Sequence, residues 1–66
     1  MPIRETQLQI AERHVSEGAQ RIARQRALIV WMTERGLPTA EAQIFLRELQ
    51  AAQRELTAHL ERLRAE

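Results

Sequence analysis

The chain has 66 residues, of which 44% are apolar by a broad count and 29% are charged, and its formal net charge is +1. A chain this short forms one domain at most, and without cysteine it has no disulfide framework, thiolate metal site or thiol nucleophile. One tryptophan and one phenylalanine cannot build an ordinary globular core, and the near-zero net charge argues against strong nonspecific binding to DNA or an anionic membrane.

A first helix is predicted over residues 4–35. This segment is rich in Ala, Leu, Glu, Gln and Arg, which are good helix formers. Apolar, small and amide residues recur in it at alternating steps of three and four, which places them on one face of a helix. This stripe comprises Leu8, Ala11, Val15, Gly18, Ile22, Gln25, Ile29 and Met32.

A turn is predicted at residues 36–38. Gly36 suits the left-handed position that follows a helix C-terminus, and Pro38 cannot continue the first helix. Thr39 is a favourable N-cap for a second helix, with Glu41 near the positive end of its dipole.

A second helix is predicted over residues 39–64, with Phe45, Ala52 and His59 widening its stripe on one side. The two stripes predict an all-α antiparallel hairpin with a shallow crossing angle. A turn centred near residue 37 would pair residues whose numbers add up to about 74, so Gly18 is expected opposite Leu56 and Ile29 opposite Phe45. The stripe of the second helix comprises Ala42, Leu46, Leu49, Gln53, Leu56, Leu60 and Leu63.

We call the contact between the two stripes the seam. Apolar residues also lie outside it. Leu28 and Trp31 fall on one flank of the first helix and Val30 on another. Because an isolated hairpin buries little apolar surface, we expect two copies to form a dimeric four-helix bundle through these residues. Docking of the hairpin on a different protein explains the same residues.

A metal site is a weaker candidate. His14 and His59 are expected at nearly the same level of the hairpin, with Glu17 and Glu55 on the same helix faces, so two imidazoles and two carboxylates could bind a divalent ion. In the alternative, each histidine edges the seam and bonds a carboxylate. Dimetal bundle sites use repeated Glu-x-x-His pairs, which this chain lacks, so no resident metal or cofactor is expected.

A short basic patch is formed by Arg21, Arg24 and Arg26. It could contact phosphate or an acidic partner, which gives a nucleic-acid-associated protein as the second function. In the alternative it is a solvated helix face, with Glu17 pairing Arg21. Because this basic stripe is short, we consider a nucleic-acid partner less favoured than a protein partner.

The sequence contains no recognisable catalytic motif, because no nucleophilic residue lies beside a base and no glycine-rich loop could bind a phosphate. The apolar run from Ala27 to Met32 is far shorter than the roughly 20 residues of a membrane-spanning helix, and the N-terminus has no apolar signal core. We therefore expect a cytoplasmic, non-enzymatic interaction protein, an adaptor or regulator.

Three stretches carry a further resemblance: AERHVSEGAQRIARQRALI, ERGLPTAEAQIFLREL and AHLERLR. Together they resemble a group of short, arginine-rich bacterial proteins seen mostly in alphaproteobacteria, over about residues 11–64. The resemblance implies that a small protein of this layout is a natural family, and it transfers no active site. The residues that carry it are His14, Gly18, Arg21, Ile22, Gln25, Arg26, Gly36, Thr39 and Ala42.

Overall fold

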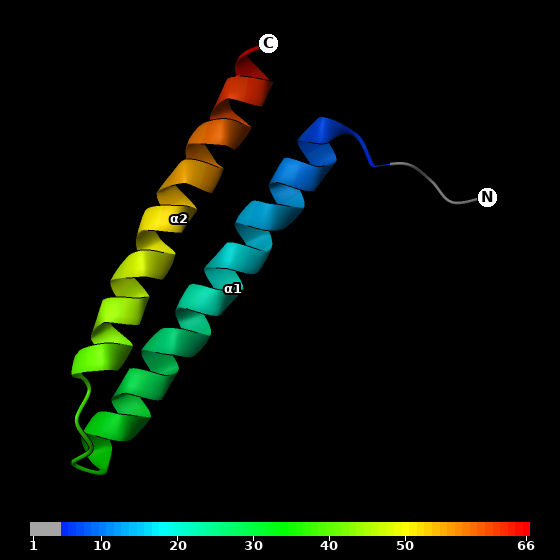
Figure 1. The fold of residues 1–66 in the computed structure, drawn as a ribbon. Helices are drawn as coiled ribbons and strands as arrows, with labels where there is room; N and C mark the ends of the chain where they lie inside the picture. The colour runs from blue at the N-terminus through cyan, green and yellow to red at the C-terminus, as the bar shows by residue number, and fades with distance from the viewer. Residues whose placement is uncertain (1–4) are drawn as a thin grey trace.

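Two helices packed side by side make up the fold (Figure 1). The computed structural model describes residues 5–66, in which α1 spans Gln7–Glu34 and α2 spans Ala40–Ala65. The helices run antiparallel, and the described residues contain no strand. The predicted all-α hairpin is therefore confirmed.

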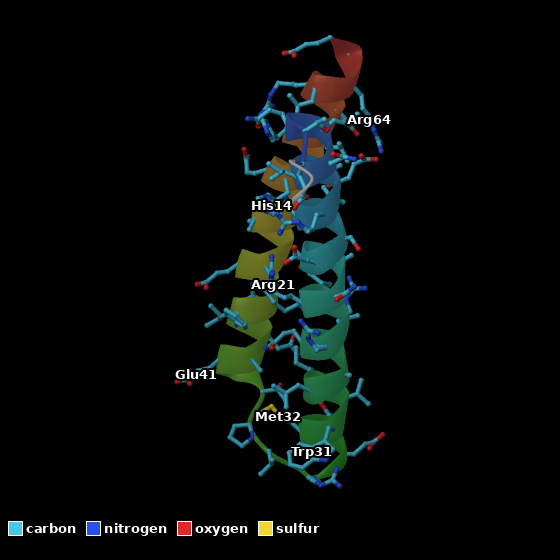
Figure 2. All side chains as sticks on the ribbon, turned by 90° about the vertical axis from the view of Figure 1, so that its right-hand side faces the viewer. His14, Arg21, Trp31, Met32, Glu41 and Arg64 are labelled. Carbon is cyan, nitrogen blue, oxygen red and sulfur yellow. The ribbon has the colours of Figure 1, made fainter. Side chains whose placement is uncertain are left out.

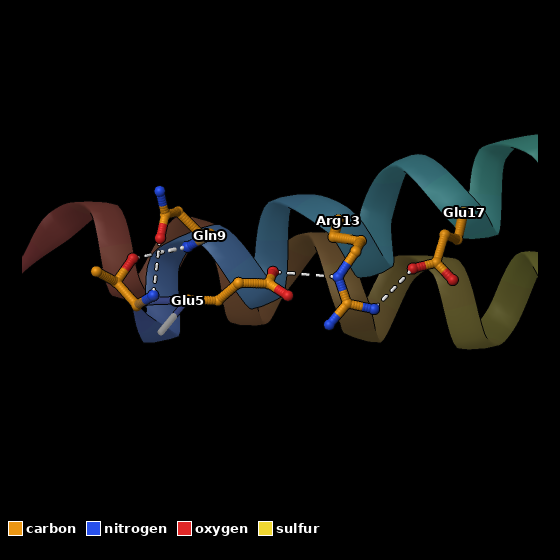
Figure 3. A network of polar contacts seen from close by, with 5 residues as sticks. Glu5, Gln9, Arg13 and Glu17 are labelled. Carbon is orange, nitrogen blue, oxygen red and sulfur yellow. Dashed lines mark hydrogen bonds and ion pairs between the residues drawn. The ribbon is translucent and has the colours of Figure 1, made fainter. Parts of the chain in front are cut away.

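The start of α1 is set by a capping box. The Thr6 hydroxyl accepts a hydrogen bond from the backbone N–H of Gln9 at 3.1 Å, and the Gln9 side chain accepts one from the backbone N–H of Thr6 at 2.8 Å (Figure 3). These two bonds satisfy donors that a helix N-terminus leaves free. The helix was expected from residue 4, which lies outside the described residues; it begins at Gln7 because Thr6 caps it.

The end of α1 follows the glycine signal. Gly36 has a φ of 69°, so its predicted left-handed conformation is confirmed. Its N–H donates to the Thr33 carbonyl at 3.1 Å, and the Leu37 N–H donates to the Met32 carbonyl at 2.9 Å, which is the Schellman pattern. Thr39 does flank α2, but its side chain makes no capping bond, and α2 begins at Ala40.

The seam lies where the 3-4 spacing put it. Every stripe position from Ala11 to Met32 in α1, and from Ala42 to Leu63 in α2, is buried or half-buried. The first stripe position, Leu8, is 38% exposed, so the seam does not extend to the start of α1. The residues expected to widen the stripe of the second helix differ: Phe45, Ala52 and His59 are exposed. A single layer of two helices covers one stripe on each helix and leaves its flanks in solvent.

The register differs from the expected one by about one turn. Gly18 faces Gln53 rather than Leu56, and a Cβ on Gly18 would collide with the Gln53 amide. The cause is the non-helical linker 37–39, since a residue outside a helix can advance up to about 3.3 Å, whereas a helical one advances about 1.5 Å. Three such residues carry the start of α2 further from the turn than a symmetric hairpin would. Level residues then have numbers adding up to about 71, which places Ala11 beside Leu60.

Two glutamines bond across the seam. The Gln25 side-chain amide donates to the Ala42 carbonyl at 2.9 Å, and the Gln53 amide donates to the Val15 carbonyl at 2.8 Å. The Gln53 Oε1 atom is buried without a partner. These amides fill seam positions that leucine would otherwise occupy, and they tie each helix to the backbone of the other.

The core of this layer is thin. Within residues 5–66, the buried residues are Ala11, Gly18 and Leu60. Neither α1 nor α2 is both long and apolar enough to cross a membrane.

Candidate interaction surface

An apolar groove of about 690 Å³ lies beside the turn. Leu28 and Met32 of α1 face Phe45 of α2 across it, and Pro38 closes the end near the linker. Leu28 remains 45% exposed and Phe45 50% exposed, so the groove presents large apolar side chains to solvent. Its remaining lining residues are Gln25, Ala40, Glu41 and Ala42.

The groove belongs to one long face of the hairpin. Residues seven apart lie on the same side of a helix, since two turns take about 7.2 residues. The rows that continue Leu28, Glu41 and Phe45 along the helices therefore share the side of the groove. Figure 2 shows His14, Arg21 and Glu41 on one side of the molecule and Arg64 on the other. We call this side the groove face: His14, Glu17, Arg21, Arg24, Leu28 and Trp31 on α1, and Glu41, Phe45, Glu48, Ala52, Glu55 and His59 on α2.

The two edges of the groove face have opposite charge. Arg21 and Arg24 lie on the α1 edge, and Glu41, Glu48 and Glu55 lie on the α2 edge. None of these five takes part in an ion pair within residues 5–66, and all five are exposed. The face therefore carries an acidic row on α2 and, on α1, the arginine pair Arg21 and Arg24, followed toward the N-terminus by Glu17, which is paired with Arg13 at 3.0 Å.

The three predicted interface residues do not form one surface. Leu28 lines the groove. Trp31 lies beside it, and one side of its indole is covered by the Arg35 guanidinium, 4.1 Å from the ring centroid. Val30 is 56% exposed but lies about 200° around α1 from Leu28, on the opposite flank.

The three arginines of the predicted basic patch also lie on two different sides of α1. Arg21 and Arg24 share the groove face, whereas Arg26 lies about 140° around the helix from Arg21. Glu17, expected to pair with Arg21, instead accepts a hydrogen bond from Arg13 at 3.0 Å, and Arg13 also bonds Glu5 at 3.1 Å (Figure 3). The bond to Glu5, and then the bond to Glu17, raise the pKa of the Arg13 guanidinium above its ordinary value.

The candidate metal ligands are not gathered into a site. His14 and His59 are exposed on the groove face, and Glu17 is bonded to Arg13. Across residues 5–66, no three histidine or acidic side chains lie close enough together to hold a metal ion. The arrangement His14, His59, Glu17 and Glu55 is thus not assembled within one hairpin.

On the opposite face, an ion pair joins the two helices. Arg64 of α2 contacts Glu12 of α1 at 3.4 Å, and this is the ion pair that joins the two helices in the described part of the chain. Polar residues, Gln43, Gln50 and Thr57, run along the same flank of α2 toward Arg64.

Sequence reasoning missed the part of the surface that α2 contributes. Phe45 is predicted at the edge of the seam opposite Ile29, and no prediction concerns Glu48. The seven-residue spacing of Glu41, Glu48 and Glu55 was the available signal, because it predicts a single acidic edge.

Comparisons with protein-family models, curated proteins and solved structures find no match to this chain. The resemblance to short arginine-rich bacterial proteins stays a prediction. Any function must therefore be argued from the two faces of the hairpin.

Proposed function

We propose that the chain is a non-enzymatic interaction protein of the cytoplasm that works through self-association of its hairpin. The observation that carries this proposal is the groove, where Leu28 and Phe45 stay about half exposed beside each other. Large apolar side chains gathered in a groove are typical of a surface that docks another protein.

The thin core supports the same proposal. The chain exposes 5361 Å² of surface. A compact monomer of this mass exposes roughly 4,300 Å². A two-helix layer with three buried residues leaves little margin over the entropy of ordering the chain, and a second layer would supply the missing burial.

The role that fits such a surface is that of a small adaptor or regulator, with the dimer as its working unit. Leu28 and Phe45 would lie at the centre of the contact and Trp31 at its margin. Their truncation should weaken assembly more than truncation of equally exposed residues elsewhere, because central apolar side chains dominate binding energy.

The test is absolute mass by light scattering over a hundredfold concentration range, with helicity followed by circular dichroism. We expect a concentration-dependent dimer whose dissociation constant rises roughly tenfold or more in Phe45→Ser. Ile44→Ser is the matched control, because Ile44 is 48% exposed but is absent from the groove lining. Equal effects of the two substitutions would remove the groove from the contact.

Nucleic-acid association is the second candidate, since Arg21 and Arg24 have no ion-pair partner within the described residues. The glutamates along the other edge of the same face oppose the approach of phosphates. A salt-sensitive gel shift that Arg21→Gln/Arg24→Gln abolishes would favour this candidate. The absence of any shift at low salt would end it.

A further inference from the structure

We infer that the groove face receives the groove face of a second copy, with the two turns at the same end of the assembly. This inference rests on the proposed self-association and adds the surface, the orientation and the pairing residues. The geometry of the charged edges and of the groove carries it.

A second copy is the occupant that complements this face. The face has a basic edge on α1, an acidic edge on α2 and an apolar groove between them at the turn end. A two-fold contact uses the same patch on both partners, so the patch must complement itself. A face with one basic and one acidic edge meets this requirement when each edge lies against the opposite edge of the other copy.

The orientation follows from that pairing. A two-fold axis parallel to the helices places α1 of one copy against α2 of the other, with both turns at one end. A two-fold axis across the helices places α1 against α1 and α2 against α2. The first arrangement joins arginines to glutamates, and the second sets like charges together, which is unfavourable.

The heights of these residues along the helices agree with a two-fold axis parallel to the helices. In the register found here, Glu48 of α2 lies level with residue 23 of α1, between Arg21 and Arg24. Phe45 lies within about one turn of the level of Leu28. Bringing two copies together with their turns at the same end therefore sets Glu48 of each copy beside the arginine pair of the other. It also gathers the Leu28 and Phe45 side chains of both copies at the turn end.

The size of the face is adequate. Two helices of this length present a surface roughly 40 Å long and 20 Å wide. Specific interfaces bury roughly 800 Å² on each partner, so one face of the hairpin suffices. The opposite face is less suited, because the Arg64–Glu12 pair and a row of polar side chains occupy it.

Charge reversal tests the face. One variant reverses the basic edge, Arg21→Glu/Arg24→Glu, and a second reverses the acidic edge, Glu48→Arg/Glu55→Arg. We expect the dissociation constant of each homodimer to rise at least about tenfold at low salt, since each reversal acts twice in a two-fold assembly. A 1:1 mixture of the two variants should recover wild-type mass and helicity. Recovery in the mixture also shows that neither variant has merely lost the ability to fold.

The orientation is tested by a variant that carries all four substitutions. With turns at the same end, this variant pairs with itself as the wild type does and fails to mix with it. Native mass spectrometry against ¹⁵N-labelled wild-type chain measures the mixing. Mixed dimers formed in preference to homodimers would overturn the orientation, because they require like helices to face each other.

A matched control uses Arg47→Glu/Arg54→Glu. These arginines are also seven apart, exposed and outside any ion pair of the described residues, and they lie on the other flank of α2. We expect wild-type dimerisation from this control. If all the groove-face variants dimerise as the wild type does, this inference is overturned while the proposed self-association stands. A wild-type chain that stays monomeric over the whole concentration range overturns both.

Discussion

The two ends of the hairpin differ in what they bury. At the open end, Ala11 is 4% exposed and Leu60 is 6% exposed, and the third buried residue, Gly18, lies in the same half. Around the turn, Leu28, Trp31 and Phe45 all remain close to half exposed. The same 3-4 pattern of stripe positions thus gives a closed seam at one end and an open groove at the other.

The difference is one of side-chain size and position. Ala11 and Gly18 leave room for a large residue from α2, so Leu60 and Gln53 can enter the seam. Near the turn, the large apolar residues Leu28 and Phe45 stand beside the seam rather than in it. The open end is therefore where the hairpin stabilises itself, and the turn end is where we expect a partner to contribute.

The largest expected effect is at the open end. Leu60→Ala should lower the free energy of unfolding by about 2–4 kcal/mol, because it removes the most buried large side chain and leaves a cavity. Urea denaturation followed by circular dichroism at one fixed protein concentration measures the loss. Ile44→Ala is the control and should change the free energy of unfolding by less than about 0.5 kcal/mol. A similar loss from both substitutions would contradict the contrast between the ends.

A smaller effect, that of Gly18→Ala on the free energy of unfolding, depends on the residue at position 53. Gly18→Ala gains about 1 kcal/mol of helix propensity, but it displaces the Gln53 amide from its bond to the Val15 carbonyl. We expect little net change in the wild type and about 1 kcal/mol of stabilisation when Gln53→Ala is also present. A double-mutant cycle by urea denaturation measures the coupling. Additive effects would show that Gln53 does not occupy the space above Gly18.

The smallest expected effect compares the two threonine caps. Thr6→Ala removes a capping box and should cost about 0.5–1 kcal/mol of unfolding free energy. Thr39→Ala removes a hydroxyl that makes no capping bond, so its cost should be close to zero. Thermal melts of both variants at equal concentration measure the difference. An equal loss would mean that Thr39 caps α2 in solution.

The fold was predictable from residue spacing, and the register was not. The 3-4 repeat marked the seam positions, and Gly36 marked the end of α1, because both follow from local geometry. The pairing of Gly18 with Gln53 depends on how far the linker 37–39 advances, which no repeat encodes. Leu28 was recognised as an exposed apolar residue. Its neighbour Phe45 was not, because a flank position of a two-helix layer looks like a core position until the number of layers is known.

The two glutamines in the seam bear on the uniqueness of the hairpin. An apolar repeat of seven residues allows neighbouring helices to slide by one repeat at modest cost, whereas a buried amide must find its carbonyl again. Gln25 and Gln53 each bond one backbone carbonyl of the other helix, that of Ala42 and that of Val15. Replacing both by leucine should raise the melting temperature and broaden the amide resonances, as several alignments come to share the population. In this small chain, a single alignment of the helices is thus maintained by two amide side chains at some cost in stability.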